Sequence, residues 1–128
     1  MTRTLVSSPQ IPVSPGYSPA IRAGGLLFIS GQVARDTQGR LVGGGDILAQ
    51  TRQVMDNLTA LLQAAGAGWG NVVKINIYTT DIVSFRRETG DLRRGYLVDP
   101  PPTSTLVEVS ALADPDFMVE IEAIAIID

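Results

Sequence analysis

The stretch Phe117-Met118-Val119-Glu120-Ile121-Glu122-Ala123-Ile124-Ala125-Ile126-Ile127 decides the fold, because its odd-numbered residues from 119 to 127 are all apolar. That alternation is typical of a β-strand with one face in the protein core. The other face carries Glu120 and Glu122 and then becomes apolar at Ile124. A carboxylate in so apolar a strand is costly unless it is solvated, paired or used. Glu120 is therefore the first candidate catalytic residue, and a structural carboxylate at a subunit seam is the alternative.

Composition limits the chemistry. The 128 residues, 45% of them hydrophobic, predict one globular domain over residues 1–128. The chain has no cysteine and no histidine. These absences exclude thiol nucleophiles, Ser-His-Asp triads, histidine bases, and thiolate or imidazole metal sites. Catalysis would have to use carboxylates, hydroxyls, arginine or lysine, backbone amides and water.

Charge and hydropathy limit the partners. The formal net charge is -3, and the arginines at 86–87 and 93–94 are interleaved with acidic residues. This pattern favours a solvated helix face over a nucleic-acid patch. The N-terminus lacks an apolar stretch long enough for a signal peptide, and no segment reaches the roughly 20 apolar residues of a membrane span. We expect a cytoplasmic protein with no membrane or nucleic-acid partner.

The remaining periodicity predicts the other elements. Prolines mark residues 7–19 as an extended loop, and a tight turn at 23–25 predicts a hairpin between strands at 20–22 and 26–30. A turn at 36–39 should return the chain through a short strand at 41–42. Apolar spacings of three and four predict a helix that Asp46 caps and Gly66 ends. The expected later elements are a strand at 72–79 with Val73, Ile75 and Ile77 on one face, a helix from about residue 84, and strands at 105–109 and 119–127.

This order, β-β-(β)-α-β-α-β-β, predicts an α+β fold with two helices on one face of a mixed sheet. The second face would keep an apolar character from Leu26, Phe28, Leu106, Ile124 and Ile126. Exposed patches of that size usually mark an interface. We therefore expect a cyclic oligomer whose sheets face one another, with cavities at the seams.

Five segments of the chain resemble the RidA/YjgF (Rid) family, the reactive-intermediate deaminases of chorismate-mutase-like fold. They keep the family order and are distributed over nearly the whole chain: Gly16-Tyr17-Ser18, Phe28–Gln32, Gln50 with Asn57-Leu58, Val72–Lys74 with Tyr78–Asp81, and Val119–Ala125. The resemblance implies a homotrimer with its sheets facing inward and a cleft at each subunit boundary. It also implies hydrolysis of enamines or imines to carbonyl compounds and ammonia, without a metal or an organic cofactor.

The resemblance assigns roles to particular residues. Glu120 matches the glutamate that holds the attacking water, Tyr17 matches a tyrosine that lines the cleft, and Ser30 and Gly31 match part of its wall. Two of these residues also have a purely structural alternative. Tyr17 could simply pack within its loop, and Ser30 could make only local backbone hydrogen bonds.

Two positions depart from the family pattern. Ser104 stands where the deaminases carry the arginine that binds the substrate carboxylate, and Thr89 stands where asparagine is common. Ser104 and its neighbour Thr105 could line a rebuilt pocket or simply begin a strand. Without the arginine, three explanations stay open: a substrate without that carboxylate, a replacement arginine elsewhere, or lost catalysis.

The leading hypothesis is metal-free hydrolysis of an imine other than 2-iminobutyrate or 2-iminopropionate, with Thr89, Ser104 and Thr105 among the substrate-binding residues. The alternative is a non-catalytic small-molecule-binding trimer that uses the same cleft. Ribonuclease activity, which attaches to parts of the family, is disfavoured by the acidic charge balance and the absent histidine.

Overall fold

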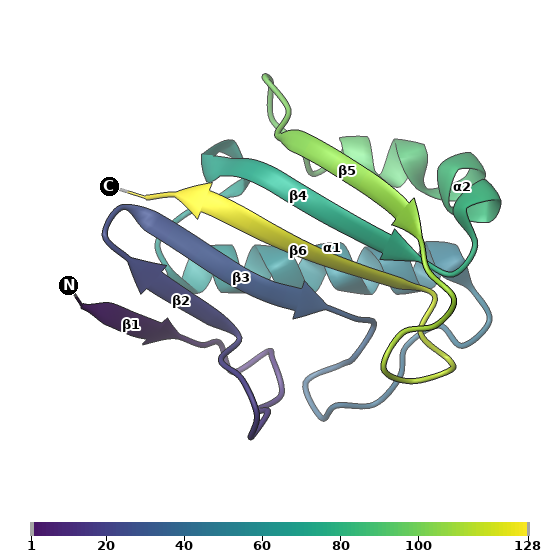
Figure 1. The fold of residues 1–128 in the computed structure, drawn as a ribbon, viewed down its shortest axis with the longest axis horizontal. Coiled ribbons are helices and arrows are strands. Elements are labelled where there is room, and N and C mark those ends of the chain that lie inside the picture. Colours follow the sequence, from purple (N-terminus) through teal and green to yellow (C-terminus); the bar gives the residue numbers. More distant parts are fainter. Residues whose placement is uncertain (1, 128) are drawn as a thin grey trace.

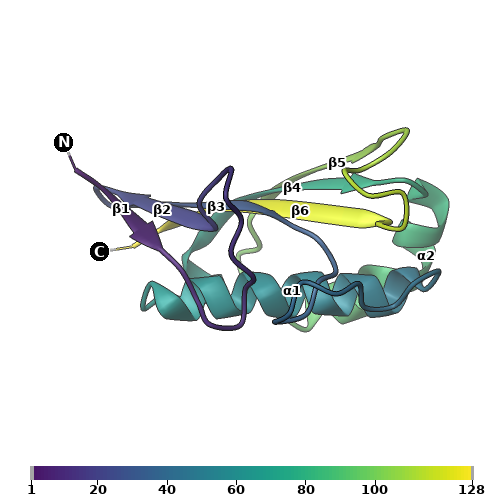
Figure 2. The same ribbon diagram turned by 90° about the horizontal axis from the view of Figure 1, so that it is seen from below.

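The computed structural model describes residues 2–127 as one six-stranded sheet with two helices packed on one face (Figures 1 and 2). The elements are β1 (Arg3–Val6), β2 (Ala20–Ala23), β3 (Leu26–Gln32), α1 (Ile47–Ala64), a 3-10 turn η1 (Trp69–Asn71), β4 (Val72–Thr79), α2 (Ile82–Arg94), β5 (Thr103–Glu108) and β6 (Val119–Ile126). The strand order is β1-β2-β3-β6-β4-β5, with β4 and β5 parallel and the other pairs antiparallel. The α+β fold with two helices on one face is thereby confirmed.

β6 lies in the middle of the sheet, between β3 and β4 (Figure 1). Its alternation is confirmed, because Val119, Ile121 and Ala125 are at most 1% exposed on the side of the helices. Glu120 and Glu122 point to the opposite side, which no helix of residues 2–127 covers (Figure 2). We call this side the open face. The central strand thus carries both the core and the candidate carboxylate on its two faces.

Helix α1 begins and ends where local signals predict. The Asp46 carboxylate accepts a hydrogen bond from the Ala49 amide at 3.1 Å, which satisfies one of the free amides of the first turn. Gly66 ends the helix with a φ of 74°, a conformation that glycine adopts without strain. The inward stripe includes Val54, Leu58 and Leu61, each fully buried. This stripe covers the sheet beneath β3 and β6.

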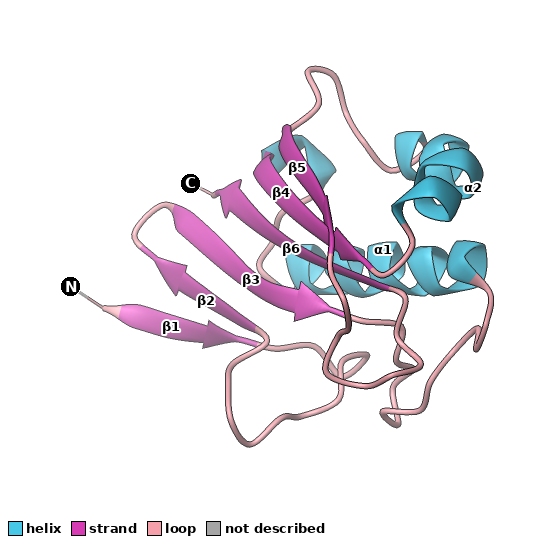
Figure 3. Ribbon diagram, turned by 45° about the vertical axis from the view of Figure 1, so that its right-hand side comes forward, coloured by secondary structure: helices cyan, strands magenta, loops and turns pink. Residues whose placement is uncertain are grey.

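Helix α2 begins two residues before the expected position, at Ile82. The reason is a pair of caps: the Asp81 carboxylate accepts from the Ser84 amide at 3.0 Å, and the Glu108 carboxylate accepts from the Ile82 amide at 3.0 Å. Figure 3 shows α2 next to α1 at the β5 end of the sheet. The second cap comes from a strand that is distant in sequence, so the helix pattern alone could not locate it.

At the beginning of the chain one strand prediction was wrong and one strand was missed. Residues 41–42 form no strand; Leu41 makes only an isolated bridge to Arg35. The edge strand is instead β1, whose register with β2 pairs Leu5 with Ile21. β1 is short and mostly exposed, and it is held by pairing with β2 rather than by an apolar pattern of its own.

Two side assignments were also wrong. Val73 is 39% exposed rather than inward, because the pairing of β4 with β6 shifts register between Val72 and Lys74. Leu106 packs against the core on the helix side, since its register partner in β4 is the buried Ile77. It therefore does not contribute to the open face.

The open face nevertheless exposes a continuous apolar area across four strands. Leu5, Phe28, Leu26 and Ile126 are between 40% and 58% exposed. The pairings Ile21↔Phe28 and Leu26↔Ile126 place them side by side from β1 to β6. Large exposed side chains in one patch indicate an interface. Within residues 2–127 the helices are too short or too polar to cross a membrane.

Candidate functional site

Glu120 lies directly against Gly31 at the end of β3. A Cβ atom built on Gly31 would lie 2.9 Å from Cδ of Glu120 and would overlap its carboxylate oxygen. The glycine sits where the β3–β6 pairing shifts register between Ile29 and Gln32, and such bulges often redirect side chains at functional sites. Two residues that the sequence singled out are thus in contact, and the absence of a side chain at Gly31 makes room for the carboxylate.

The surroundings of Glu120 raise its pKa above the ordinary value for a glutamate. Burial is the largest cause, the negative charge of Glu122 adds to it, and the positive charge of Arg35 opposes both. A carboxyl group tuned upward exchanges protons more readily near neutral pH. Glu120 is therefore suited to accept and return a proton.

Tyr78 and Glu122 are polar neighbours of Glu120 on the open face. Tyr78 is the register partner of Glu120 in β4, and its hydroxyl donates a hydrogen bond to Glu122 at 3.3 Å. The pKa of Tyr78 is raised, first by the charge of Glu122 and then by burial. The phenol therefore stays protonated and remains a hydrogen-bond donor beside the two carboxylates.

Ser30 holds the proline-rich loop onto β3. Its hydroxyl donates to the Ser18 carbonyl at 2.6 Å, and its amide donates to the Pro19 carbonyl at 2.9 Å. These bonds fix the segment that carries Tyr17, whose side chain is 57% exposed. The hydroxyl of Ser30 thus bonds the backbone of the loop, and its place in the wall of a cleft stays a prediction.

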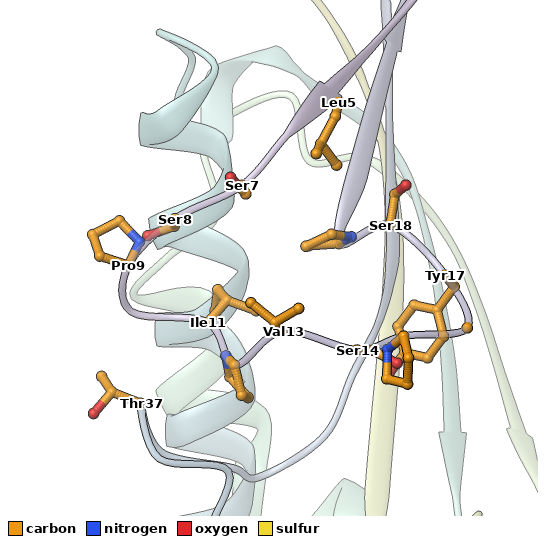
Figure 4. A pocket seen from close by; sticks show the side chains of 14 residues that line it. Leu5, Ser7, Ser8, Pro9, Ile11, Val13, Ser14, Tyr17, Ser18 and Thr37 are labelled. Atoms are coloured by element: carbon orange, nitrogen blue, oxygen red, sulfur yellow. The ribbon is translucent and has the colours of Figure 1, made fainter.

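The loop that carries Tyr17 encloses an open cavity of about 780 Å³. Figure 4 shows Tyr17 and Pro9 at opposite ends of this cavity, with Ile11 and Val13 between them. Most of its walls are proline, serine and small apolar side chains. The cavity can admit a small molecule, but it offers few groups that could do chemistry.

A second cavity, of about 40 Å³, lies between the loop and the residues that follow β3. Its lining includes Tyr17, Gly31, Gln32, Arg35 and Asn57. This volume is sufficient for one water molecule, and the polar side chains supply partners for it. Gly31 is common to this cavity and to the contact with Glu120, although Glu120 itself does not line the cavity.

Arg35 is a site residue that the sequence reasoning missed. Its guanidinium carbon lies 5.1 Å from the centre of the Phe117 ring, three residues before Glu120. Its carbonyl accepts a hydrogen bond from Asn57 at 3.0 Å, which ties it to α1. The available signal was its position three residues after the matching segment 28–32. Only the fold shows that Arg35 lies beside the segment that leads into the first residue of β6.

Three predicted residues do not join Glu120 within the chain. Thr89 is buried in α2, where its hydroxyl donates to the Phe85 carbonyl at 2.6 Å and accepts from Arg93 at 3.0 Å. Ser104 pairs with the buried Ile75, so its side chain belongs to the helix side of the sheet edge. Thr105 pairs with Asn76 and lies on the open face.

Thr105 is nevertheless far from Glu120. Val107, two residues further along β5, occupies the row of Tyr78 and Glu120. Two strand spacings across and two residues along correspond to roughly 12 Å between the Cα atoms. Within residues 2–127, no group of three or more acidic side chains is arranged to hold a metal ion.

Comparison with known proteins gives a consistent result. The family model described as endoribonuclease L-PSP matches residues 7–127. A RutC family protein of Pyrococcus horikoshii, PH0854, is 41% identical over 89% of this chain and 88% of its own length.

Solved structures agree with this relationship. A Rid-family protein of unknown function from Yersinia pestis superposes with a TM-score of 0.90 at 34% identity, covering 98% of this chain and all of that one. The E. coli protein TdcF, solved with bound serine, superposes with a TM-score of 0.84 at 27% identity, covering 98% of this chain and 99% of its own.

Proposed function

The chain belongs to the endoribonuclease L-PSP (RidA/YjgF) family, and on that premise we propose that it hydrolyses a reactive enamine or imine to a carbonyl compound and ammonia. The observation that carries the proposal is the Glu120 carboxylate, which lies against Gly31, has a raised pKa and faces the side of the sheet that no helix of residues 2–127 covers. These are the requirements for holding a water molecule and moving its proton.

The proposed steps balance with water as the only co-substrate. An enamine first tautomerises to the imine. Water attacks the imine carbon while Glu120 accepts one of its protons and passes it to the imine nitrogen, which gives the carbinolamine. Glu120 then takes the proton of the carbinolamine hydroxyl and delivers it to the nitrogen as the C–N bond breaks, so that ammonia leaves and the carbonyl forms. Tyr78 keeps its proton and could stabilise the site as a donor.

We propose that the substrate differs from 2-iminobutyrate and 2-iminopropionate. Ser104 supplies no charge at the position of the carboxylate-binding arginine. A hydrogen bond to a charged group contributes about 1.5–3 kcal/mol, so its loss should reduce kcat/KM for those substrates roughly tenfold to a hundredfold unless another cation of the site replaces it.

We further propose a homotrimer in which the open faces meet. The exposed apolar area on β1, β2, β3 and β6 supports an interface. In addition, Ser104 belongs to the helix side of the sheet edge and Thr105 lies two strands away from Glu120, so neither residue is beside Glu120 inside one chain. A neighbouring subunit in the trimer would bring such residues to the same cleft. Sedimentation measures the oligomeric state directly.

The test of the catalytic proposal is ammonia release from a panel of imines with and without carboxylates. The Glu120→Gln variant should lose the rate above background, whereas Glu88→Gln, an exposed carboxylate on α2, should retain it. Hydrolysis by Glu120→Gln at the wild-type rate on every substrate would contradict the proposed role.

A second candidate function is ligand binding without turnover. Two observations favour it: the uncharged Ser104, and the structure of the TdcF relative with bound serine. A thermal-shift screen would then identify ligands that stabilise both wild type and Glu120→Gln while no imine is consumed. Turnover of any imine that depends on Glu120 would exclude this second function.

A further inference from the structure

Arg35 brings a positive charge close enough to Glu120 to act on its carboxyl. Its charge acts on the Glu120 carboxyl, and its guanidinium lies over the ring of Phe117, at the approach to β6. Arg35 also lines the small cavity together with Tyr17 and Gly31. The chain therefore has a cation next to the proposed site although position 104 carries none.

The backbone around Arg35 is held from three directions. Asn57 of α1 donates through Nδ2 to the carbonyls of Val33 and Arg35, at 3.2 and 3.0 Å. The Arg35 amide donates to the Val33 carbonyl at 2.8 Å, and Leu41 forms a bridge with Arg35. A cation on so fixed a backbone is pre-organised, and pre-organisation lowers the entropic cost of binding.

The guanidinium keeps its hydrogen-bonding capacity available. Within residues 2–127, Arg35 makes no ion pair and donates no side-chain hydrogen bond, whereas Arg40 and Arg94 pair with carboxylates of their own segments. Contact with the Phe117 ring occupies a face of the guanidinium and leaves its N–H edge free. That edge has the fork geometry that binds a carboxylate through two hydrogen bonds.

We infer that Arg35 binds the carboxylate of the substrate, so that this chain acts on imines that carry a carboxylate. The inference rests on the proposed function. It places the arginine that binds the carboxylate on the same subunit as Glu120. This arginine lies three residues after the end of β3 rather than at the beginning of β5. The carboxylate would then approach Glu120 from a different direction than an arginine at position 104 would impose.

The test compares a 2-imino acid with the matching 2-imino amide, which has the same shape and no charge. Arg35→Met should lower kcat/KM for the acid roughly tenfold to a hundredfold and change that for the amide less than about threefold. Arg35→Lys should recover part of the loss, because it restores the charge but not the fork. Arg86→Met, an exposed arginine on the outer helix, is the matched control and should match wild type.

Binding of two stable probes separates this inference from the catalytic proposal. Wild type should bind pyruvate more tightly than pyruvamide, measured by NMR titration, and Arg35→Met should lose that preference. If this holds while no imine is hydrolysed, the catalytic proposal fails and the Arg35 assignment stands. If wild type shows no preference, or if Arg35→Met weakens acid and amide equally, the Arg35 assignment is wrong.

Discussion

A single added methyl group at Gly31 should abolish activity while leaving the fold intact. The Cβ of alanine would lie 2.9 Å from Cδ of Glu120 and would overlap its carboxylate, whereas ordinary contacts of a Cβ begin at 3.4 Å. The glutamate must therefore move by at least half an ångström. Because the clash involves the end of a flexible side chain rather than backbone, Glu120 can rotate away.

Gly31→Ala should change the free energy of unfolding little and the catalytic rate strongly. A shift of Glu120 out of its rotamer costs about 0.5–1.5 kcal/mol. Replacing glycine by alanine restores about 0.4–1 kcal/mol through the unfolded state, since the φ of Gly31 is not in the left-handed region. The free energy of unfolding should therefore change by less than about 1 kcal/mol. Loss of a positioned general base, in contrast, reduces a rate roughly a hundredfold or more.

The assay pairs urea unfolding with imine hydrolysis for Gly31→Ala and for Gly68→Ala. Gly68 is the matched control, because a Cβ there meets no atom within 4 Å and its φ of -148° suits alanine. We expect near-wild-type stability for both variants and loss of activity only for Gly31→Ala. The steric reasoning is refuted if Gly31→Ala retains the wild-type rate while Glu120→Gln does not, or if it unfolds several kcal/mol more easily.

Two further predictions concern stability. Gln50 is buried in α1, where its side chain donates to the Asp116 carbonyl at 2.9 Å and accepts from the Met118 amide at 2.8 Å. Gln50→Ala should therefore lower the free energy of unfolding in urea by roughly 3–5 kcal/mol, whereas Gln63→Ala, at an exposed position of the same helix, should lower it by less than about 0.5 kcal/mol. Equal losses would show that Gln50 does not hold the segment before β6 in place. The raised pKa of Glu120 means that its charged form is disfavoured in the folded state, so this residue weakens the fold progressively as pH rises from about 4 through its folded pKa. Glu120→Gln should accordingly raise Tm at neutral pH, with the gain vanishing toward pH 4; a lower Tm at neutral pH would contradict the desolvation argument.

Part of the candidate site could be predicted from the sequence because its signals are local. The alternation in residues 117–127 identified the buried face of β6 and also the carboxylate of Glu120 within this apolar strand. The resemblance in residues 28–32 pointed to Gly31, whose contact with Glu120 the structure then explained sterically. The roles of Thr89, Ser104 and Thr105 stay predictions, and their positions make any shared pocket with Glu120 depend on another subunit.

Other features depended on contacts between distant segments. β1 has no pattern that distinguishes it from a loop, since pairing with β2 holds it. The side on which Leu106 lies follows from the parallel register of β5 with β4, and a shift of one residue would have placed it on the open face. Arg35 has no local motif, and the fold alone brings it over Phe117.

The sequence by itself therefore determined the period of each helix and of the central strand, and the caps of α1. It also showed that the Glu120 carboxylate lies in an otherwise apolar strand, where burying a charge is costly. These depend on side chains three or four apart along a helix or two apart along a strand. The alternation also placed Glu122 on the face of Glu120, but tertiary structure alone decided its other neighbours, because Gly31, Tyr78 and Arg35 come from β3, β4 and a loop. Their contacts depend on register and on the path of the chain, which local periodicity does not encode.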